Sequence, residues 1–185
     1  MKAVIQRVKS ASVLGMYSID CSEFNLFDLC RLVDGKLISK IGPGLCVLIG
    51  ISRDDKEADS DWIVNKILKL CLFDNIESGR RWSSNVVDRQ LEILCVSQFT
   101  LYATLKGNKL DFHQSMESTT SRIVYETLLD KMRRSYDPSK IHDGLFGALM
   151  AVDIVNDGPV TINIESPQRP ACKHKVPIES KVEKE

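Results

Sequence analysis

Apolar and polar residues alternate at two places along the chain, which is the period of a strand with one buried face. Residues 1–13 predict a first strand, and Val160, Ile162 and Ile164 alternate with polar neighbours in a later one. The segment "NDGP" (156–159) separates this later run from the apolar run "ALMAVDIV". Because Asn, Asp, Gly and Pro favour turns, the pattern predicts a corner at which two strands meet.

Three further segments predict strands. "RLVDGKLISKIG" (31–42) is typical of a hairpin whose turn is at Asp34-Gly35. A Gly-Pro-Gly turn then precedes a buried strand at 45–51. "QLEILCVSQFTLYA" (90–103) is largely apolar on both faces, as expected for a long strand in the centre of a sheet.

The helical period occurs in two longer segments. Residues 53–73 place apolar side chains on one face and aspartates in the first turn, where the helix dipole favours them. Residues 115–136 predict a second amphipathic helix, with Arg133 and Arg134 near its carboxyl end. The apolar positions are Ile63, Val64, Ile67, Leu68 and Cys71 in the first helix and Val124, Leu128 and Met132 in the second.

Composition limits the classes of protein. The chain has 185 residues, 43% of them apolar and 27% charged, which suits one globular domain that we place at 1–165. Lys plus Arg and Asp plus Glu both number 25, which argues against a general nucleic-acid binder. No apolar run approaches ~18 residues and no signal peptide is evident, so we expect no membrane contact and a cytoplasmic location. Residues 14–31 indicate an insertion in the first hairpin, and the Lys/Glu/Pro-rich residues 166–185 a disordered tail.

The six cysteines contain no CxxC pair, and without a secretory signal we expect them to be reduced. Cys46, Cys71 and Cys95 lie in apolar runs, where a thiol packs as a small hydrophobe. Cys172 and His174 supply two ligands in a polar tail, too few for a zinc site. The sequence therefore predicts no metal and no cofactor.

Candidate chemistry is concentrated in the central strand. Alternation sends Ser97 and Phe99 to one face and Gln98 and Thr100 to the other. A polar side chain among apolar neighbours costs roughly 1–3 kcal/mol if it lacks a partner. The partners are either cross-strand hydrogen bonds inside a barrel or a ligand in a pocket, and the residues alone leave both open. With three histidines and no paired carboxylates, catalysis would depend on backbone dipoles or on the substrate itself.

Two motifs carry a resemblance to a known family. "VSQFTLYA" (96–103) and "NDGPVTI" (156–162) are similar to the two signature motifs of D-aminoacyl-tRNA deacylases. The stretches "IGPGL", "KGNKLDFH" and "FGALM" resemble the same family, and the likeness covers residues 1–13 and 32–165. Leu110 departs from the pattern, since the family usually has proline there.

The resemblance implies a homodimer with a β-barrel-like α+β fold and two main helices packed outside. The active site would lie at the subunit interface, where Gly158-Pro159 of one subunit, with a cis peptide, reaches into the "SQFT" pocket of the other. Arg7 matches the arginine that anchors this loop. The implied reaction is hydrolysis of the ester of D-aminoacyl-tRNA, with L-amino acids rejected because their side chains would meet the loop backbone. Glycyl-tRNA, which has no side chain to exclude, is an expected second substrate.

By the same resemblance, Ser97, Gln98, Phe99 and Thr100 form the catalytic set, with Gln98 as an oxyanion donor. Thr100 lacks a base, so the 2′-hydroxyl of the terminal ribose is expected to assist water. The residues expected at the tRNA 3′ end are Phe146 and Met150 around the terminal adenosine, Lys106, Lys109 and Phe112, and Arg80 and Arg81 near phosphates. The basic residues are equally consistent with solvated surface charges. Two alternatives stay open: a nucleic-acid-binding protein on the same scaffold, and a dimer with a purely structural role.

Overall fold

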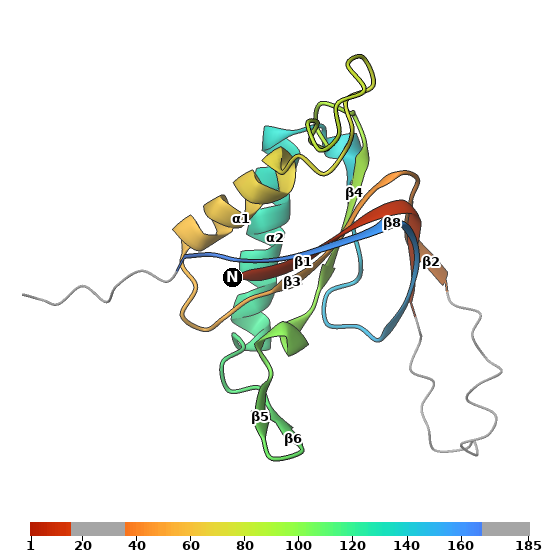
Figure 1. The fold of residues 1–185 in the computed structure, drawn as a ribbon. Coiled ribbons are helices and arrows are strands. Elements are labelled where there is room, and N and C mark those ends of the chain that lie inside the picture. Colours follow the sequence, from red (N-terminus) through yellow and green to blue (C-terminus); the bar gives the residue numbers. More distant parts are fainter. Residues whose placement is uncertain (16–35, 168–185) are drawn as a thin grey trace, which may run out of the picture.

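Figure 1 shows a strongly curved sheet with helices packed against one of its faces. The computed structural model describes residues 1–15 and 36–167. The elements in chain order are β1 Lys2–Gly15, β2 Lys36–Ile41, β3 Gly44–Gly50, α1 Glu57–Lys69, β4 Glu92–Ser97, the 3-10 helix η1 Phe99–Tyr102, β5 Thr104–Lys106, β6 Lys109–Asp111, α2 Ser118–Ser135, the 3-10 helix η2 Pro138–Lys140, β7 Ile141–Asp143 and β8 Met150–Glu165.

The first strand, β1, organises the sheet. One of its edges pairs antiparallel with β8 along the whole strand, and the other pairs first with β3 and then with β2. β4 and β7 extend the sheet beyond β3 in parallel. The Ser39 hydroxyl of β2 donates a hydrogen bond to the Asp143 carbonyl of β7 at 2.6 Å. The two ends of the sheet order therefore meet, which gives the barrel-like form.

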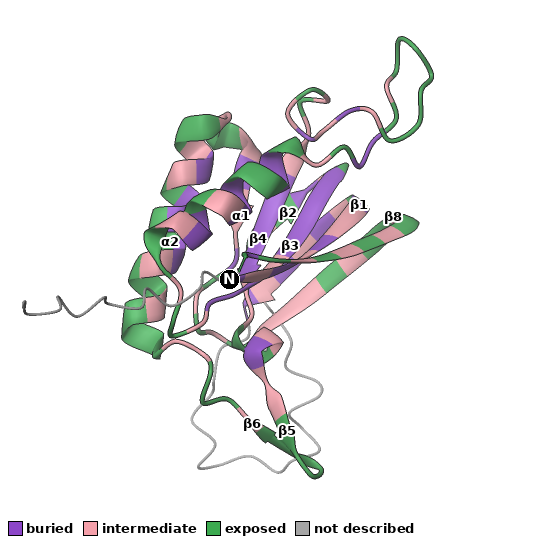
Figure 2. Cartoon of the chain, turned by 60° about the vertical axis from the view of Figure 1, so that its left-hand side comes forward, coloured by how far each residue is buried: buried purple, intermediate pink, exposed green. Residues whose placement is uncertain are grey.

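The main core lies between the sheet and the helices, and Figure 2 marks buried residues on both. Ile5 and Ile49 of the sheet pack there with Ile67 of α1 and Leu128 of α2. The other face of the sheet carries a second buried cluster, made of Val8, Ala11, Val13, Ile41, Cys46, Leu94 and Val96. β3 and β4 are thus buried on both faces, which explains their continuous apolar runs. The predicted α+β fold with helices outside is confirmed.

Both predicted helices form, within narrower bounds than the sequence pattern indicates. α1 begins after Lys56, whose backbone N–H donates to the Asp59 carboxylate at 2.9 Å, and ends at Lys69. Cys71 lies beyond the end of the helical period and is exposed, so the prediction that it packs in the core is wrong. On α2 the buried side chains are Tyr125, Leu128, Leu129 and Met132, and Val124 is half-buried.

The predicted strand at 90–103 is wrong beyond Ser97. β4 ends there, and Phe99–Tyr102 form a 3-10 helix. The pairing partner β3 ends at Gly50, and Leu101 packs so close that a Cβ added to Gly50 would lie 2.8 Å from the Leu101 Cβ. The chain turns over this glycine, so the predicted alternation of faces does not extend past the end of the strand.

The predicted corner before Val160 is a bulge inside one continuous strand. β8 stays on β1 on both sides of it, because Arg7 pairs with Val160 and the next residue, Val8, pairs with Asn156. Residues 157–159 have no opposite position on β1. The predicted alternation of half-buried and exposed residues after the bulge is confirmed.

Several predicted features lie outside the described residues. They are the turn at Asp34-Gly35, most of the insertion, Cys172 and His174, and nearly all of the tail. Of the hairpin predicted at 31–42, only the part from residue 36 onward is described, and there β2 pairs with β1. In the described part of the chain, no helix has the length and apolar character needed to cross a membrane.

Candidate active site

A cavity of about 570 Å³ opens beside the carboxyl end of β4. Its walls come from that strand end and η1, from the start of α2, and from the loop that leads into β8. Of the predicted site residues, Ser97, Gln98, Phe99, Phe146 and Met150 line it. The other lining residues are Ile49, Ile51, Val96, Ser115, Met116, Ser118, Ser121, Gly147, Ala148, Leu149 and Val152. The fold thus brings the first signature motif to the segment that precedes the second.

Gln98 stands at the junction between β4 and η1. Its backbone N–H donates to the Ile49 carbonyl at 2.7 Å, and its side-chain amide donates to the Thr100 hydroxyl. Thr100 is exposed, and among residues 1–15 and 36–167 its hydroxyl has no histidine or carboxylate partner. A hydroxyl nucleophile needs an adjacent base, and Thr100 does not have one here.

Aromatic side chains from two segments border the cavity. Phe99 is 58% exposed and lies edge-on to Phe112, with ring centroids 5.0 Å apart. Phe146 packs against the buried Tyr125 at 5.5 Å, and the Arg122 guanidinium lies 5.3 Å from the Phe146 centroid. Apolar ring faces with a cation nearby suit a nucleobase.

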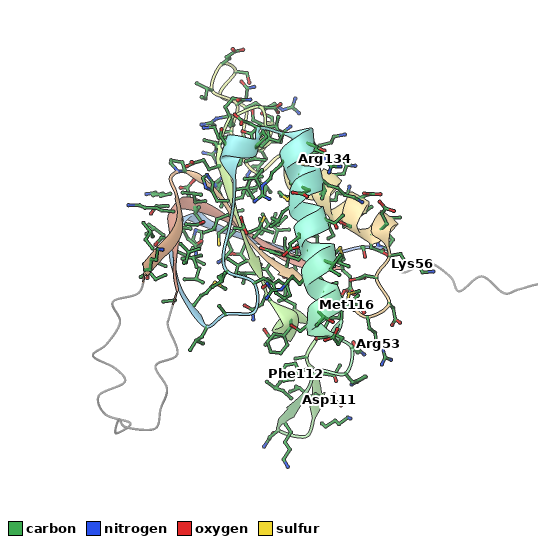
Figure 3. The ribbon with its side chains drawn as sticks, turned by 180° about the vertical axis from the view of Figure 1, so that it is seen from behind. Arg53, Lys56, Asp111, Phe112, Met116 and Arg134 are labelled. Carbon is green, nitrogen blue, oxygen red and sulfur yellow. The ribbon has the colours of Figure 1, made fainter. Side chains whose placement is uncertain are left out.

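Polar contacts hold the walls of the cavity together. The Ser115 hydroxyl donates to the Phe99 carbonyl at 3.0 Å, which ties η1 to the segment that leads into α2. The Leu145 N–H donates to the Met150 thioether at 3.2 Å, which closes the loop before β8. Figure 3 shows the neighbouring Met116 at the start of α2. Because Phe99, Ser115 and Met150 all line the cavity, these bonds tie its walls together.

The β5–β6 hairpin carries the predicted tRNA-contacting lysines, Lys106 and Lys109, and projects from the body of the molecule (Figures 1 and 2). Asp111 accepts hydrogen bonds from the Lys106 ammonium and, at 2.9 Å, from the His113 Nδ1. The bond from Lys106, followed by those from His113, holds the pKa of Asp111 well below its usual range. Figure 3 shows Phe112 beside Asp111 at the base of this hairpin, below the start of α2.

The Gly158-Pro159 bulge lies apart from the cavity. Both residues are exposed, neither lines the cavity, and the peptide bond between them is cis. Arg7 supports the bulge, because its Nε donates to the Asp157 carbonyl at 3.3 Å and lies 3.0 Å from the Asp157 carboxylate. Within one chain, therefore, the two signature motifs do not meet.

The segment between α1 and β4 holds residues that sequence reasoning did not place. Arg80 and Arg81 are exposed there, at the opposite end of the molecule from the β5–β6 hairpin (Figure 1), so the predicted basic residues do not form one patch. Sequence reasoning missed Trp82 and the Leu72 carbonyl, which both contact Arg7. The signal was a tryptophan in the polar stretch "GRRWSSN", where no apolar period assigns it to a core.

A second hollow of about 650 Å³ lies between α1 and α2. Its charged side chains are partly paired, since the Lys131 ammonium lies 2.5 Å from the Asp61 carboxylate and 3.0 Å from that of Glu57. This hollow contains none of the predicted site residues. The cavity beside β4 is therefore the candidate active site.

Comparison with known proteins places this geometry in a family. A family model described as D-Tyr-tRNA(Tyr) deacylase matches residues 4–165. The D-aminoacyl-tRNA deacylase of Drosophila melanogaster is 50% identical over 169 residues, which cover 91% of this chain and 94% of the relative. D-aminoacyl-tRNA deacylase 1 of Homo sapiens is 48% identical over 167 residues, or 90% of this chain and 71% of the relative.

A solved structure described as c-Myc DNA Unwinding Element Binding Protein is also similar. It superposes with a TM-score of 0.78 at 48% sequence identity, over 91% of this chain and 100% of that one. The sequence and fold comparisons agree over the part of the chain that contains both signature motifs.

Proposed function

The chain belongs to the D-Tyr-tRNA(Tyr) deacylase family, and from this premise we propose how it recognises the handedness of its substrate. As a member of this family it is a hydrolase that cleaves the ester between a D-amino acid and tRNA. The observation that carries the finer proposal is the separation of the two motifs. Each chain has an open cavity beside "SQFT" and an exposed Gly158 bulge that does not reach it.

A homodimer resolves this separation. In a two-fold dimer, if a segment of one subunit contacts a given surface of its partner, the same segment of the partner contacts the same surface of the first subunit. We therefore place Gly158-Pro159 of each subunit over the cavity of the other. Support comes from the exposure of both features and from the anchoring of the bulge by Arg7, which keeps it from folding back onto its own chain.

Chiral selection then follows from the main chain of the bulge. Gly158 has φ +114 and no side chain, so its backbone can approach a ligand closely. With backbone carbonyls held against the α-carbon of the bound amino acid, a D-residue directs its side chain away from them, whereas an L-residue directs its side chain into them. Rejection by such a clash does not depend on which side chain is present. Glycine has no side chain to reject, so glycyl-tRNA is a second substrate of this site.

Hydrolysis needs little from the protein beyond position. Water adds to the ester carbonyl carbon, the bond to the ribose 3′-oxygen breaks, and that oxygen leaves with a proton. The neighbouring 2′-hydroxyl of the tRNA assists the attacking water, because Thr100 has no base in the described chain. The Gln98 amide and the first N–H groups of η1, which have no partner inside the helix, stabilise the oxyanion. One such donor typically lowers the activation barrier by about 3–4 kcal/mol.

The rest of the tRNA 3′ end binds along the same surface. Phe146 and Met150 enclose the terminal adenosine, with Phe146 stacking on the base. Lys106 and Lys109 on the hairpin meet phosphates further along the strand, and Phe112 supports Phe99. Aminoacyl-tRNA is consumed by translation, so we place the enzyme in the cytoplasm.

The test uses matched D-tyrosyl-tRNA, L-tyrosyl-tRNA and glycyl-tRNA with the full chain. The expected result is release of D-tyrosine and glycine and retention of L-tyrosine, together with a dimer in sedimentation. Release from both tyrosyl substrates, or from neither, would contradict the proposal.

The name of one solved relative favours a second candidate function, binding of nucleic acid on the same scaffold. The discriminating measurement is affinity for duplex DNA of wild type and a Gly158→Ala variant. Tight, salt-sensitive binding that is unchanged in the variant, with no D-tyrosine release by wild type, would support this second function over the first.

A further inference from the structure

The Arg7 guanidinium connects the Gly158 bulge to a part of the chain outside both signature motifs. Its Nε binds Asp157 in the bulge, and its Nη1 donates to the Leu72 carbonyl at 2.7 Å. The Trp82 ring covers the same guanidinium, with the ring centroid 5.7 Å from Cζ. As a result the arginine side chain is only 16% exposed. Three segments distant in sequence therefore meet at one cation.

The contact on the bulge side is close. A Cβ added to Gly158 would lie 3.2 Å from the Arg7 Nη2, so the guanidinium packs directly against the glycine backbone. Arg7 is also the β1 residue opposite Val160, at the position where the register breaks. A shift of the guanidinium therefore removes support from the residue that approaches the substrate.

The contact on the other side is held by the local structure around Trp82. Phe73 and Ser84 exchange backbone hydrogen bonds of 3.0 Å in each direction, which closes the segment between them. Trp82 has φ +54, a left-handed conformation that a residue with a Cβ adopts only when it is held. The backbone N–H of Trp82 donates to the Asp74 carboxylate at 3.1 Å, and the residue remains 51% exposed. The segment thus presents an aromatic face to the cation, an arrangement that attracts a guanidinium.

We propose that Trp82 is a positioning residue for chiral selection: its ring and the Leu72 carbonyl hold the Arg7 guanidinium, which in turn sets the position of Gly158. The inference rests on the proposed function, since Gly158 must be the group that excludes L-amino acids. It assigns part of the specificity of the site to the segment 72–84, which contributes nothing to the cavity lining.

The experiment compares kcat/KM for D-tyrosyl-tRNA and L-tyrosyl-tRNA in Trp82→Ala, Trp82→Phe and wild type. Trp82→Ala should lower the D-to-L ratio by about tenfold or more, mainly through faster L-hydrolysis, whereas Trp82→Phe, which keeps an aromatic face, should stay within about threefold. Ile76→Ala, at a residue of the same segment that is 77% exposed, is the matched control and should match wild type. Should Trp82→Ala fail to fold, Trp82→Leu carries the same expectation.

A double-mutant cycle shows whether the effect passes through Arg7. In an Arg7→Lys background, Trp82→Ala should change the ratio by less than about twofold, because the contact is already lost. Wild-type selectivity with an unchanged ratio in Trp82→Ala would overturn this inference and leave the proposed function standing. Absence of D-selectivity in wild type would overturn both.

Discussion

The side-chain amide of Gln98 donates a hydrogen bond to the hydroxyl of Thr100, across the turn from β4 into η1. An amide N–H that donates cannot take the threonine proton. The contact therefore orients the hydroxyl without activating it, and it ties Thr100 to Gln98, a residue that lines the cavity, whereas Thr100 itself does not.

Thr100→Ala is therefore expected to retain activity. Turnover of D-tyrosyl-tRNA should fall by no more than about tenfold, because the variant loses one orienting contact and no nucleophile. Single-turnover release of D-tyrosine measures this, with Thr100→Ser as the control that keeps the hydroxyl. A folded Thr100→Ala protein with turnover reduced about a thousandfold would favour a covalent route.

Gly158→Ala should impair D-selective hydrolysis. An added Cβ would lie 3.0 Å from the Val160 Cγ2 and 3.2 Å from the Arg7 Nη2, and the residue has a positive φ. The bulge must then move, which alters the surface presented to the partner. The matched control is Gly79→Ala, because Gly79 also has a positive φ, +64, and an added Cβ meets nothing within 4 Å. Equal effects of the two variants on the D-to-L ratio would contradict the prediction.

Glu117 is expected to make the stability of α2 depend on pH. The Thr119 hydroxyl, followed by the backbone N–H groups of Thr119 and Thr120, lowers the pKa of Glu117 from its usual 4.5 to about 2. Because the folded-state pKa is the lower one, the contribution to stability is full above pH 4.5 and is lost as the pH falls toward 2. Glu117→Gln should therefore melt a few degrees below wild type at pH 7, and the gap should narrow below pH 4.5.

Thermal unfolding at pH 7, 4 and 3 measures this gap. Glu126→Gln, at an exposed position in the middle of the same helix, is the control and should follow wild type at each pH. A gap that stays constant across the series would show that Glu117 does not act through its charge.

Leu128→Ala should strongly destabilise the fold. Leu128 of α2 is 0% exposed, and its side chain packs against the sheet. Truncation of such a leucine lowers the free energy of unfolding by about 2–5 kcal/mol. Ile123 lies on the same helix and is 64% exposed, so Ile123→Ala should change the free energy of unfolding by no more than about 0.5 kcal/mol. Urea unfolding compares the two, and similar losses would contradict the assigned core face.

Lys109→Ala should weaken tRNA binding without slowing the chemical step. Lys109 is exposed on the β5–β6 hairpin, so its charge is available to a phosphate. The expected result is a higher KM at low salt and an unchanged kcat. The slope of log KM against log salt concentration should fall by about one unit. Lys69→Ala, at the exposed end of α1, is the control. An equal KM in both variants would contradict the role of the hairpin in tRNA binding.

Local periodicity predicted correctly which residues are buried wherever the geometry of a single strand or helix determines burial. The alternation in β1 and after the bulge in β8 follows from strand geometry, and the buried face of each helix follows from the 3.6-residue period. It failed where an element ends. β4 stops at Ser97 because β3 ends at Gly50, and Cys71 is exposed because α1 has already ended. Neither event is visible in a local pattern.

The amino-acid sequence alone determined the two motifs, the family resemblance and the residue types available for chemistry. Only the tertiary structure decided that Ser97, Phe146 and Met150 share one cavity, that Gly158 projects from an unbroken strand, and that Trp82 lies on Arg7. The physical reason is that chemical type and period are properties of neighbouring residues. The meeting of residues 7, 82 and 158 depends on strand register and on packing between segments far apart in the chain.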